Sequence, residues 1–272
     1  MELAIILCCY NRIEKTKNCI LSLQKILSKM ADIRHRFYVF DDGSTDGTVE
    51  MLQSILNQTD VLLQGTNNYW SKSMHKAMAR AKQNNPDIYL CVNDDVEFND
   101  NALEIMLEDF NAKNGDAAIV GSTIFDETIT YGGLTKRQEI INPNSDLQEC
   151  YFANFNCFMV GKKIVSKIGL IDKHYGHSFG DYDYAMRINK AGYKVYVAHD
   201  IIGICENDHG LPKYRLAKYS KKERLANLKS PKGLNMSSLL RFTYKTGDRE
   251  ELLNIIRYYV NVRRAISSGR DI

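Results

Sequence analysis

Residues 36–48 read RFYVFDDGSTDGT, an apolar run that ends in two carboxylates and is followed by a glycine-rich turn. A continuous apolar run of this kind is typical of a strand buried on both faces of a sheet. Gly43 and Gly47 favour a tight turn, because glycine adopts positive φ angles without steric cost. A helical pattern of apolar residues comes next. The stretch therefore predicts a strand that carries Asp41 and Asp42 to the end of a sheet, with a helix after it.

The same alternation of apolar runs and helical patterns extends through the first 110 residues. Alternating strands and helices predict a mainly parallel sheet with right-handed crossovers. In such sheets ligands bind beyond the carboxyl ends of the strands, so the site is expected at that edge. The expected strands are residues 3–10, 36–42, 60–65 and 87–98, and the expected helices are residues 11–29, 47–56, 71–84 and 101–111.

From residue 117 the sequence pattern predicts shorter strands separated by turns. We therefore expect one α/β domain over residues 1–210, with a nucleotide-binding half (1–115) and an acceptor-binding half (116–210). Residues 211–272 are expected to form a basic helical extension. Within the second half, strands are expected at residues 117–125, 128–134, 153–161 and 193–199, and helices at residues 162–169 and 181–192.

The charge of the chain is small overall but unevenly distributed. The 272 residues carry a net charge of +3, with 44% hydrophobic and 25% charged residues, as in ordinary globular proteins. From residue 210 onward there are 15 Lys and Arg against 5 Asp and Glu, whereas the preceding part has 21 against 28. A basic tail on an acidic body suggests an acidic partner, such as a phosphate-bearing acceptor or an anionic membrane. A solvated helical face explains the pattern equally well.

The cysteines and the apolar runs of the sequence predict the cellular compartment of the protein. The seven cysteines form no CxxC pair, and several lie in apolar runs, where cysteine acts as a small core residue. This pattern predicts a reducing, cytoplasmic setting. Residues 3–9 lack the basic flank of a secretion signal, and no run has the length of a membrane-spanning helix. We expect a cytoplasmic protein, or one peripheral at the inner face of the membrane.

Three acidic motifs are candidates for substrate binding, metal binding or catalysis. Asp41 and Asp42 can accept hydrogen bonds from a base imide and a ribose hydroxyl, although a plain turn with a helix cap is the alternative. Asn93-Asp94-Asp95 follows a buried run, and its carboxylates suit Mg²⁺ or Mn²⁺ shared with substrate phosphates. The alternative there is an ordinary loop turn.

The third motif is GDYDYAMR, residues 180–187. An inverting sugar transfer needs one carboxylate to take the proton of the acceptor hydroxyl, and Asp181 suits this role. The alternative is acidic charge at a helix start with an i,i+4 pair between Asp183 and Arg187. We assign the catalytic interpretation to Asp181 and the ion pair to Asp183.

The order of these motifs resembles the family 2 glycosyltransferases with a GT-A fold, over roughly residues 1–209. The glycine- and asparagine-rich segment GTNNYWSKSMHKAMARA, residues 65–81, resembles the family's loop and helix beside the donor. Residues 168–193 resemble its acceptor and base segment. Shorter likenesses, such as ANFNCFMV (residues 153–160), are similar to a bacterial subgroup and imply that the tail belongs to one catalytic unit.

The resemblance implies roles for individual residues. Asp41 and Asp42 would hold the nucleoside, and Asp94 would lie near the ribose or diphosphate. Asp95 would be the main ligand of Mn²⁺ or Mg²⁺, and Asp181 would be the general base. The chain departs from the family pattern in that Gly180 replaces a Glu and Asn93 replaces a first carboxylate. Further candidates are Cys9, Tyr10, Arg12, Asn68 and Lys72 on the nucleotide side, Trp70, Asn154, Asn156, His177, Gly180 and Asp183 on the acceptor or sugar side, and His209 as a metal ligand.

The expected function is an inverting, metal-dependent transfer of a sugar from a UDP- or dTDP-type donor to a glycan or lipid-linked acceptor, in bacterial surface polysaccharide synthesis. One alternative is a nucleotidyltransferase, but residues 8–15 lack the glycine-rich loop such an enzyme carries. Another is a catalytically degenerate module of the same fold that only binds nucleotide or glycan. Asp95 and Asp181 argue against it.

The sequence of the basic tail is compatible with more than one kind of partner. Residues 212–233 interleave Lys and Arg with Tyr and Leu, which suits a membrane surface or a lipid-phosphate acceptor. Nucleic acid is disfavoured because the rest of the chain is acidic. Residues 252–266 have helical apolar spacing and are expected to pack on the body, on a membrane or on a second subunit as a homodimer.

Overall fold

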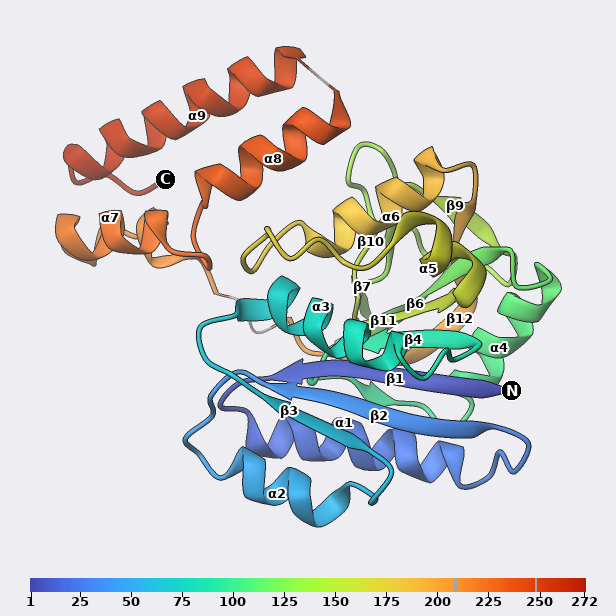
Figure 1. The fold of residues 1–272 in the computed structure, drawn as a ribbon. Helices are drawn as coiled ribbons and strands as arrows, with labels where there is room; N and C mark the ends of the chain where they lie inside the picture. The colour runs from blue at the N-terminus through green and yellow to red at the C-terminus, as the bar shows by residue number, and fades with distance from the viewer. Residues whose placement is uncertain (208–209, 248) are drawn as a thin grey trace.

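The run that leads to Asp41 forms the second strand from one edge of a ten-stranded sheet in the computed structural model, which describes residues 1–207, 210–247 and 249–272. Strand β2 (Arg34–Asp41) pairs in parallel with β1 (Glu2–Cys9) and β3 (Val61–Gln64), and β4 (Ile88–Val92) pairs in parallel with β1. These four strands confirm the predicted parallel half (Figure 1).

The rest of the sheet is mixed in direction. Strand β11 (Cys157–Gly161) lies antiparallel between β4 and β6 (Ala117–Phe125), and β12 (Lys194–Ile204) runs parallel to β6. The strand order is β3-β2-β1-β4-β11-β6-β12-β5. The shorter strands are β5 (Glu97–Phe98), β7 (Thr128–Tyr131) and β9 (Gln148–Cys150) in this sheet, and β8 (Gly133–Leu134) with β10 (Phe152–Ala153) in a two-stranded sheet.

Several expected strands are wrong in extent. The expected strand at 128–134 is divided into β7 and β8, which lie in different sheets, and the expected strand at 193–199 continues to Ile204. The expected strand at 87–98 ends at Val92, and Glu97–Phe98 joins the far edge of the sheet beside β12. The chain between them turns across the sheet edge and carries Asp94 and Asp95 there. The expected strand at 153–161 begins only at Cys157.

Helices cover both faces of the sheet. Alternate residues of β1 point to opposite faces: Leu3, Ile5 and Leu7 join one core cluster, and Ala4 and Ile6 join the other. Both faces are therefore buried, which is why the strand reads as a continuous apolar run. One face packs on α1 (Ile13–Leu27), α2 (Thr48–Ile55) and α4 (Ala102–Ala112), and the other on α3 (Tyr69–Lys82), α5 (Lys162–Ile168) and α6 (Gly180–Lys190).

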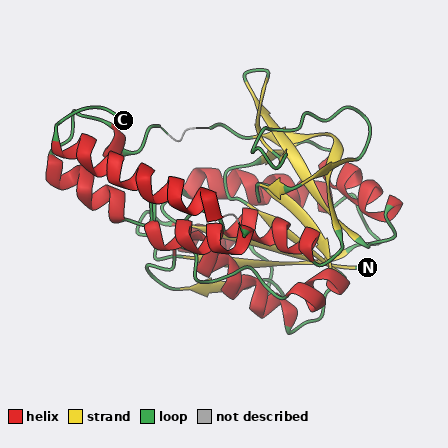
Figure 2. Ribbon diagram, turned by 90° about the horizontal axis from the view of Figure 1, so that it is seen from above, coloured by secondary structure: helices red, strands yellow, loops and turns green. Residues whose placement is uncertain are grey.

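The tail is helical, as expected. A 3₁₀ turn (Lys213–Arg215) leads into α7 (Lys221–Lys229), α8 (Met236–Thr246) and α9 (Arg249–Ser267). Figure 1 shows β1 running from the N-terminus toward the side on which these helices lie, and Figure 2 shows them grouped at one end of the molecule. Tyr214, Leu228, Val262 and Ile266 form a core of their own within this extension.

The basic stretch of residues 212–233 is only partly solvated. Arg224 is 1% exposed and donates from Nε to the Tyr214 carbonyl at 3.0 Å and from Nη2 to the Arg270 carbonyl at 2.6 Å. This arginine therefore holds the extension together.

All seven cysteines are free thiols, and six are buried, as expected for core residues. Among the described residues, no helix has the length and apolar character needed to cross a membrane.

Candidate active site

Arg12 contacts both carboxylates of one acidic motif that the sequence singles out, Asn93-Asp94-Asp95. Strands β1 and β4 are parallel neighbours, so the segments that follow them meet at one edge of the sheet. There Arg12 Nη1 lies 2.7 Å from Asp95 Oδ2 and 3.4 Å from Asp94 Oδ1. The fold thus brings Arg12, Asp94 and Asp95 together, as the sequence predicts.

Asp94 is held inside the protein. It is 6% exposed, and its Oδ2 accepts a hydrogen bond from the Thr16 hydroxyl at 3.0 Å. Burial raises the pKa of Asp94 to about 6, an effect that Arg12 opposes and the neighbouring Asp95 reinforces. Thr16 is fully buried and was not among the expected site residues. Its one signal in the sequence is its position, one helical turn beyond Arg12 on α1.

Asp95 has one oxygen that the protein leaves unsatisfied. Its Oδ2 pairs with Arg12, but its Oδ1 is buried and has no hydrogen-bond partner among the described residues. A buried oxygen without a partner is costly, and it fits a position that a ligand completes. Mn²⁺ and Mg²⁺ accept carboxylate oxygens readily, so the residues fit the metal that the resemblance implies.

The described side chains alone do not form a complete set of metal ligands. The described residues contain no group of three or more His, Cys, Asp or Glu side chains placed to hold a metal ion. Asp95, with Asp94 beside it, would hold the ion together with ligands that the substrate brings. His209, the expected extra ligand, lies outside the described residues.

Asn93 explains the missing first carboxylate. Its Oδ1 accepts a hydrogen bond from Trp70 Nε1 at 2.8 Å, and its Nδ2 donates to Asn156 Oδ1 at 3.1 Å. An ionised Asp could accept the first bond but could not donate the second. The structure therefore brings Trp70 and Asn156 to the site, with the Trp70 ring edge-on to Phe155 at 5.8 Å between centroids.

Asp41 organises the turn that follows β2. Its Oδ1 accepts hydrogen bonds from the backbone N–H groups of Gly43 at 3.0 Å and Ser44 at 2.9 Å, and the Cys9 thiol lies 3.6 Å from Oδ2. The residue is 1% exposed. Gly43 has φ of +91°, and a Cβ there would lie 2.8 Å from the Thr66 methyl, so the turn requires glycine.

Asp42 organises the start of α3. Its carboxylate accepts hydrogen bonds from the backbone of Asn68 and Tyr69 at 2.8–3.0 Å and from the Asn68 side chain at 2.8 Å. Tyr69 has φ of +57°, a strained conformation for a bulky residue. Strain of this kind clusters at binding loops. Tyr10 and Lys72 lie exposed beside these segments, on the loop after β1 and on the first turn of α3.

Asp181 lies in the first turn of α6 and is partly exposed. Burial raises its pKa to about 6, while hydrogen bonds from the Tyr182 and Phe155 backbone and from the Asn154 side chain oppose this rise. A carboxylate with a pKa near the working pH is suited to accept a proton. Asn154, expected at the border of the acceptor pocket, thus contacts the candidate base itself.

Gly180 lies where α3 and α6 touch. A Cβ at this position would lie 2.4 Å from Ser71 Oγ and 3.1 Å from the Trp70 ring. A Glu, which the family pattern places here, cannot fit unless α3 moves. Trp70 therefore touches both Asn93, which precedes the acidic pair Asp94–Asp95, and Gly180, which precedes the candidate base.

The carboxylate of Asp183 is occupied by contacts with other side chains of the protein. It is fully buried, and Arg187 Nε donates to its Oδ2 at 2.8 Å, which is the i,i+4 pair that the spacing predicts. Tyr175 donates to its Oδ1 at 3.2 Å, and Lys245 of α8 does so at 2.7 Å. This burial leaves Asp183 no surface for an acceptor. His177 lies exposed in the loop between α5 and α6.

The helical extension reaches the same region through Asp172. Arg241 and Lys245 both donate to Asp172 Oδ2 at 2.7 Å. Burial by itself would raise the pKa of Asp172, but hydrogen bonds from Lys245, His174 and Arg241 hold that pKa well below its usual range. No motif in the sequence indicates this link between α8 and the loop before α6.

A cavity of about 580 Å³ lies elsewhere, and it contains none of the expected donor residues. It is lined by residues 124, 127–129, 142–145 and 199–201. We place the candidate site at the acidic motifs because the unsatisfied carboxylate oxygen, the titratable base and the strained loop are found there.

Comparisons with known proteins show the family to which the chain belongs. Residues 4–169 match the model of the family described as Glycosyl transferase family 2, a span of more than half of the chain that includes Arg12, Asp42 and Asp95. No curated protein matches the chain.

Among solved structures, the mannosyltransferase PcManGT from Pyrobaculum calidifontis, in complex with GDP-Man and Mn²⁺, is similar with a TM-score of 0.58 and 12% identity, over 98% of this chain and 73% of that chain. S. aureus TarS 1–349 is similar with a TM-score of 0.54 and 16% identity, over 75% of this chain and 60% of that one. The crystal structure of S. aureus TarS gives 0.56 and 17%, over 75% of this chain and 36% of that one. This chain thus spans less than two thirds of either TarS structure, and identities this low show the fold alone.

Proposed function

The chain belongs to glycosyl transferase family 2 and has the GT-A fold, and from this we propose that it transfers a sugar from a nucleoside-diphosphate sugar to an acceptor hydroxyl with inversion. The observation that carries the proposal is the position of Trp70, whose Nε1 donates to Asn93 and whose ring lies against Gly180. Asn93 precedes Asp94 and Asp95, and Gly180 precedes Asp181, so a donor diphosphate at the acidic pair and an acceptor hydroxyl at Asp181 would lie near the same side chain.

Each of the site residues has its own role in the proposed reaction. Asp181 takes the proton of the acceptor hydroxyl, whose oxygen attacks the anomeric carbon as the nucleoside diphosphate leaves. Asp41 and Asp42 shape the loops around the nucleoside, and Asp95 would hold Mn²⁺ or Mg²⁺. When bound, the ion would stabilise the charge that develops on the leaving diphosphate.

The donor type is proposed from the aspartates after β2, and the acceptor from the likeness of the motifs to a bacterial subgroup. A UDP- or dTDP-type donor suits a carboxylate that reads a base imide, and of the two aspartates only Asp42 is partly exposed. PcManGT carries GDP-Man, so guanine is included in the test. The acceptor is proposed to be a glycan or a lipid-linked sugar of a bacterial surface polysaccharide. With a lipid-linked acceptor, the protein would act in the cytoplasm at the inner face of the membrane.

Thermal unfolding of the purified protein with UDP, dTDP, GDP and CDP, each with and without Mn²⁺, tests the donor site. A ligand that binds only the folded state raises the midpoint by mass action. We expect one nucleotide to raise it, with a metal-dependent part that Asp95→Ala removes. If none of the four does so at millimolar concentration, the donor site is wrong. Binding without turnover of any sugar nucleotide would instead favour a module that only binds its ligands.

A further inference from the structure

Helix α9 presents an apolar row to solvent. Leu253, Ile256 and Val260 are 56%, 44% and 40% exposed, and their spacing of three and four residues places them on one face. The opposite face is already used, because Val262 and Ile266 pack against Tyr214 and Leu228 in the core of the extension. Single exposed aliphatic residues are ordinary, but a row on one helix indicates an interaction surface.

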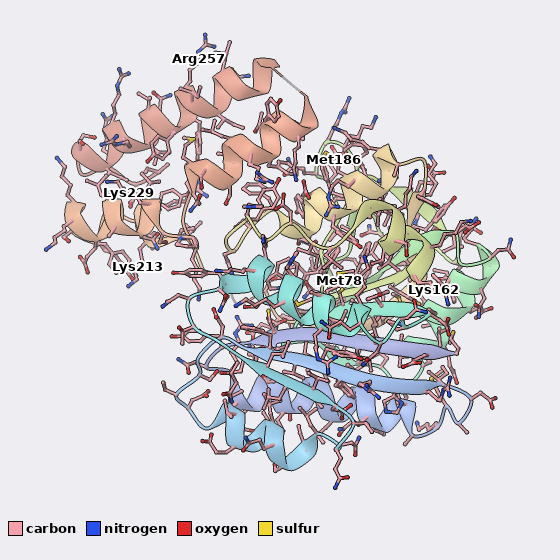
Figure 3. All side chains as sticks on the ribbon, viewed as in Figure 1. Met78, Lys162, Met186, Lys213, Lys229 and Arg257 are labelled. Carbon is pink, nitrogen blue, oxygen red and sulfur yellow. The ribbon has the colours of Figure 1, made fainter. Side chains whose placement is uncertain are left out.

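Arginines flank this row. At 100° per residue, Arg257, Arg263 and Arg264 project within about 70° of its centre, and all three are exposed. Figure 3 shows Arg257 extending from α9 away from α7 and α8. Residues 252–270 contain no Asp or Glu, so nothing within this stretch neutralises the arginines.

We propose that this face of α9, with its row of Leu253, Ile256 and Val260 and its three arginines, docks on an anionic lipid bilayer. Aliphatic side chains enter the boundary between head groups and acyl chains, and arginines extend their stems along that surface to reach lipid phosphates. The excess of Lys and Arg over the whole extension adds long-range attraction to an anionic surface.

A second copy of the chain fits this face less well. A twofold contact places the same patch on both subunits, so six arginines would meet in one interface without acidic partners from residues 252–270. Anionic lipids remove that repulsion, which is why the charge pattern favours a bilayer over a homodimer.

Docking would also orient the candidate active site. Helix α8 packs on α9, and its Arg241 and Lys245 are bonded to Asp172 and Asp183 beside the candidate base. The bilayer contact and Asp181 are therefore connected through one set of packed helices. This last step rests on the proposed function, whereas the docking itself does not.

Co-sedimentation of the full chain with vesicles tests the proposal. We expect binding to phosphatidylcholine vesicles that contain phosphatidylglycerol, little binding to phosphatidylcholine alone, and weaker binding as salt is raised. The variants Ile256→Ser/Val260→Ser and Arg263→Gln/Arg264→Gln should each lower the partition coefficient at least tenfold. Leu21→Ser, which changes an aliphatic residue 41% exposed on α1, is the matched control and should bind like the wild type.

Three outcomes would overturn the proposal. The wild-type protein could fail to bind anionic vesicles at low salt, or the α9 variants could bind them as well as Leu21→Ser does. The third outcome is a wild-type protein that binds no vesicles but is a dimer in sedimentation velocity, and that becomes a monomer with Ile256→Ser/Val260→Ser. The last outcome would assign the face to a second copy. Circular dichroism and nucleotide-dependent thermal shifts establish that each variant is folded. Because vesicle binding is measured without substrate, its failure is separable from failure of the proposed activity.

Discussion

Lys245 of α8 lies 2.7 Å from Asp183 of α6, across 62 residues of sequence. The ammonium group also reaches Asp172 Oδ2 at 2.7 Å, so one lysine joins two carboxylates that border the segment carrying Asp181. The side chain of Lys245 is 25% exposed and that of Asp183 is fully buried. The basic extension is therefore tied to the helix of the candidate base by a defined contact as well as by apolar packing.

We expect Lys245→Met to destabilise the protein and to lower turnover. Asp183 keeps Arg187 and Tyr175, and Lys245 is partly solvated, so the loss in free energy of unfolding should be about 1–2 kcal/mol. Urea unfolding measures this loss, and turnover should fall with little change in donor KM. Lys194→Met breaks a pair with Glu149 in which both side chains are about half exposed, and it should leave the free energy of unfolding almost unchanged. Equal losses in the two variants would contradict a special role for Lys245.

The pH dependence of turnover should report Asp181. Because burial raises its pKa to about 6, its carboxyl group is protonated below that pH and cannot accept the acceptor's proton. We expect kcat to fall about tenfold per pH unit below pH 6 and to be level above it. Asp94 also has a pKa raised to about 6, so the profile should be measured at saturating donor and metal, which Asp94 would contact. A flat profile between pH 5 and 8 would exclude Asp181 as the base.

Asp181→Asn tests the same residue by its chemistry. The amide keeps the shape of the side chain but cannot take a proton. We expect kcat to fall about 10²- to 10⁴-fold while donor binding, followed by thermal shift, is unchanged. Asp126→Asn, on an exposed turn, is the control and should leave kcat unaltered. A loss of donor binding together with kcat would point to misfolding of α6 and not to removal of a base.

The parallel half of the fold could be predicted because its signals are local. Each of β1 to β4 is a continuous apolar run, and each run is followed by turn residues or a helical pattern. The mixed half could not be predicted to the same extent. The place of Glu97–Phe98 is decided by pairing with Gly203–Ile204, about one hundred residues away, and no local pattern encodes a partner at that distance.

The candidate site divides in the same way. The acidic motifs and the pair between Asp183 and Arg187 follow from short spacings within the chain. Thr16 and Lys245 were missed because each lies in a helix with an ordinary polar and apolar pattern, while its partner is 78 or 62 residues away. Gly180 was noticed as a departure, but its cause lies in α3, at Ser71.

Gly180→Ala should be destabilising because of that contact. The added Cβ would lie 2.4 Å from Ser71 Oγ and 3.1 Å from the Trp70 ring, so the Ser71 side chain must turn away or α3 and α6 must separate slightly, at a cost of about 1–3 kcal/mol in unfolding free energy. Ser71 Oγ has no hydrogen-bond partner among the described residues, so Ser71→Ala should itself cost little and should recover part of the loss in the double variant. Gly210→Ala, where a Cβ meets nothing within 4 Å, is the control. Additive effects of Gly180→Ala and Ser71→Ala would contradict a direct clash.

Asn93→Asp should weaken the protein even though it restores the family's first carboxylate. The new carboxylate still accepts from Trp70 Nε1, but it faces the Asn156 oxygen without a proton to donate and adds negative charge beside Asp94. We expect a loss of about 1–3 kcal/mol in unfolding free energy at neutral pH, since a buried polar pair is left without its hydrogen bond. The loss should shrink when Mn²⁺ and nucleotide are present, because a bound cation offsets the added charge. Thermal unfolding with and without these ligands measures both effects. Asn57→Asp, a change of the same kind on the exposed segment after α2, should show neither the loss nor the rescue. If Asn93→Asp is as stable as the wild type without ligands, the amide is not needed as a donor and this account of the missing carboxylate fails.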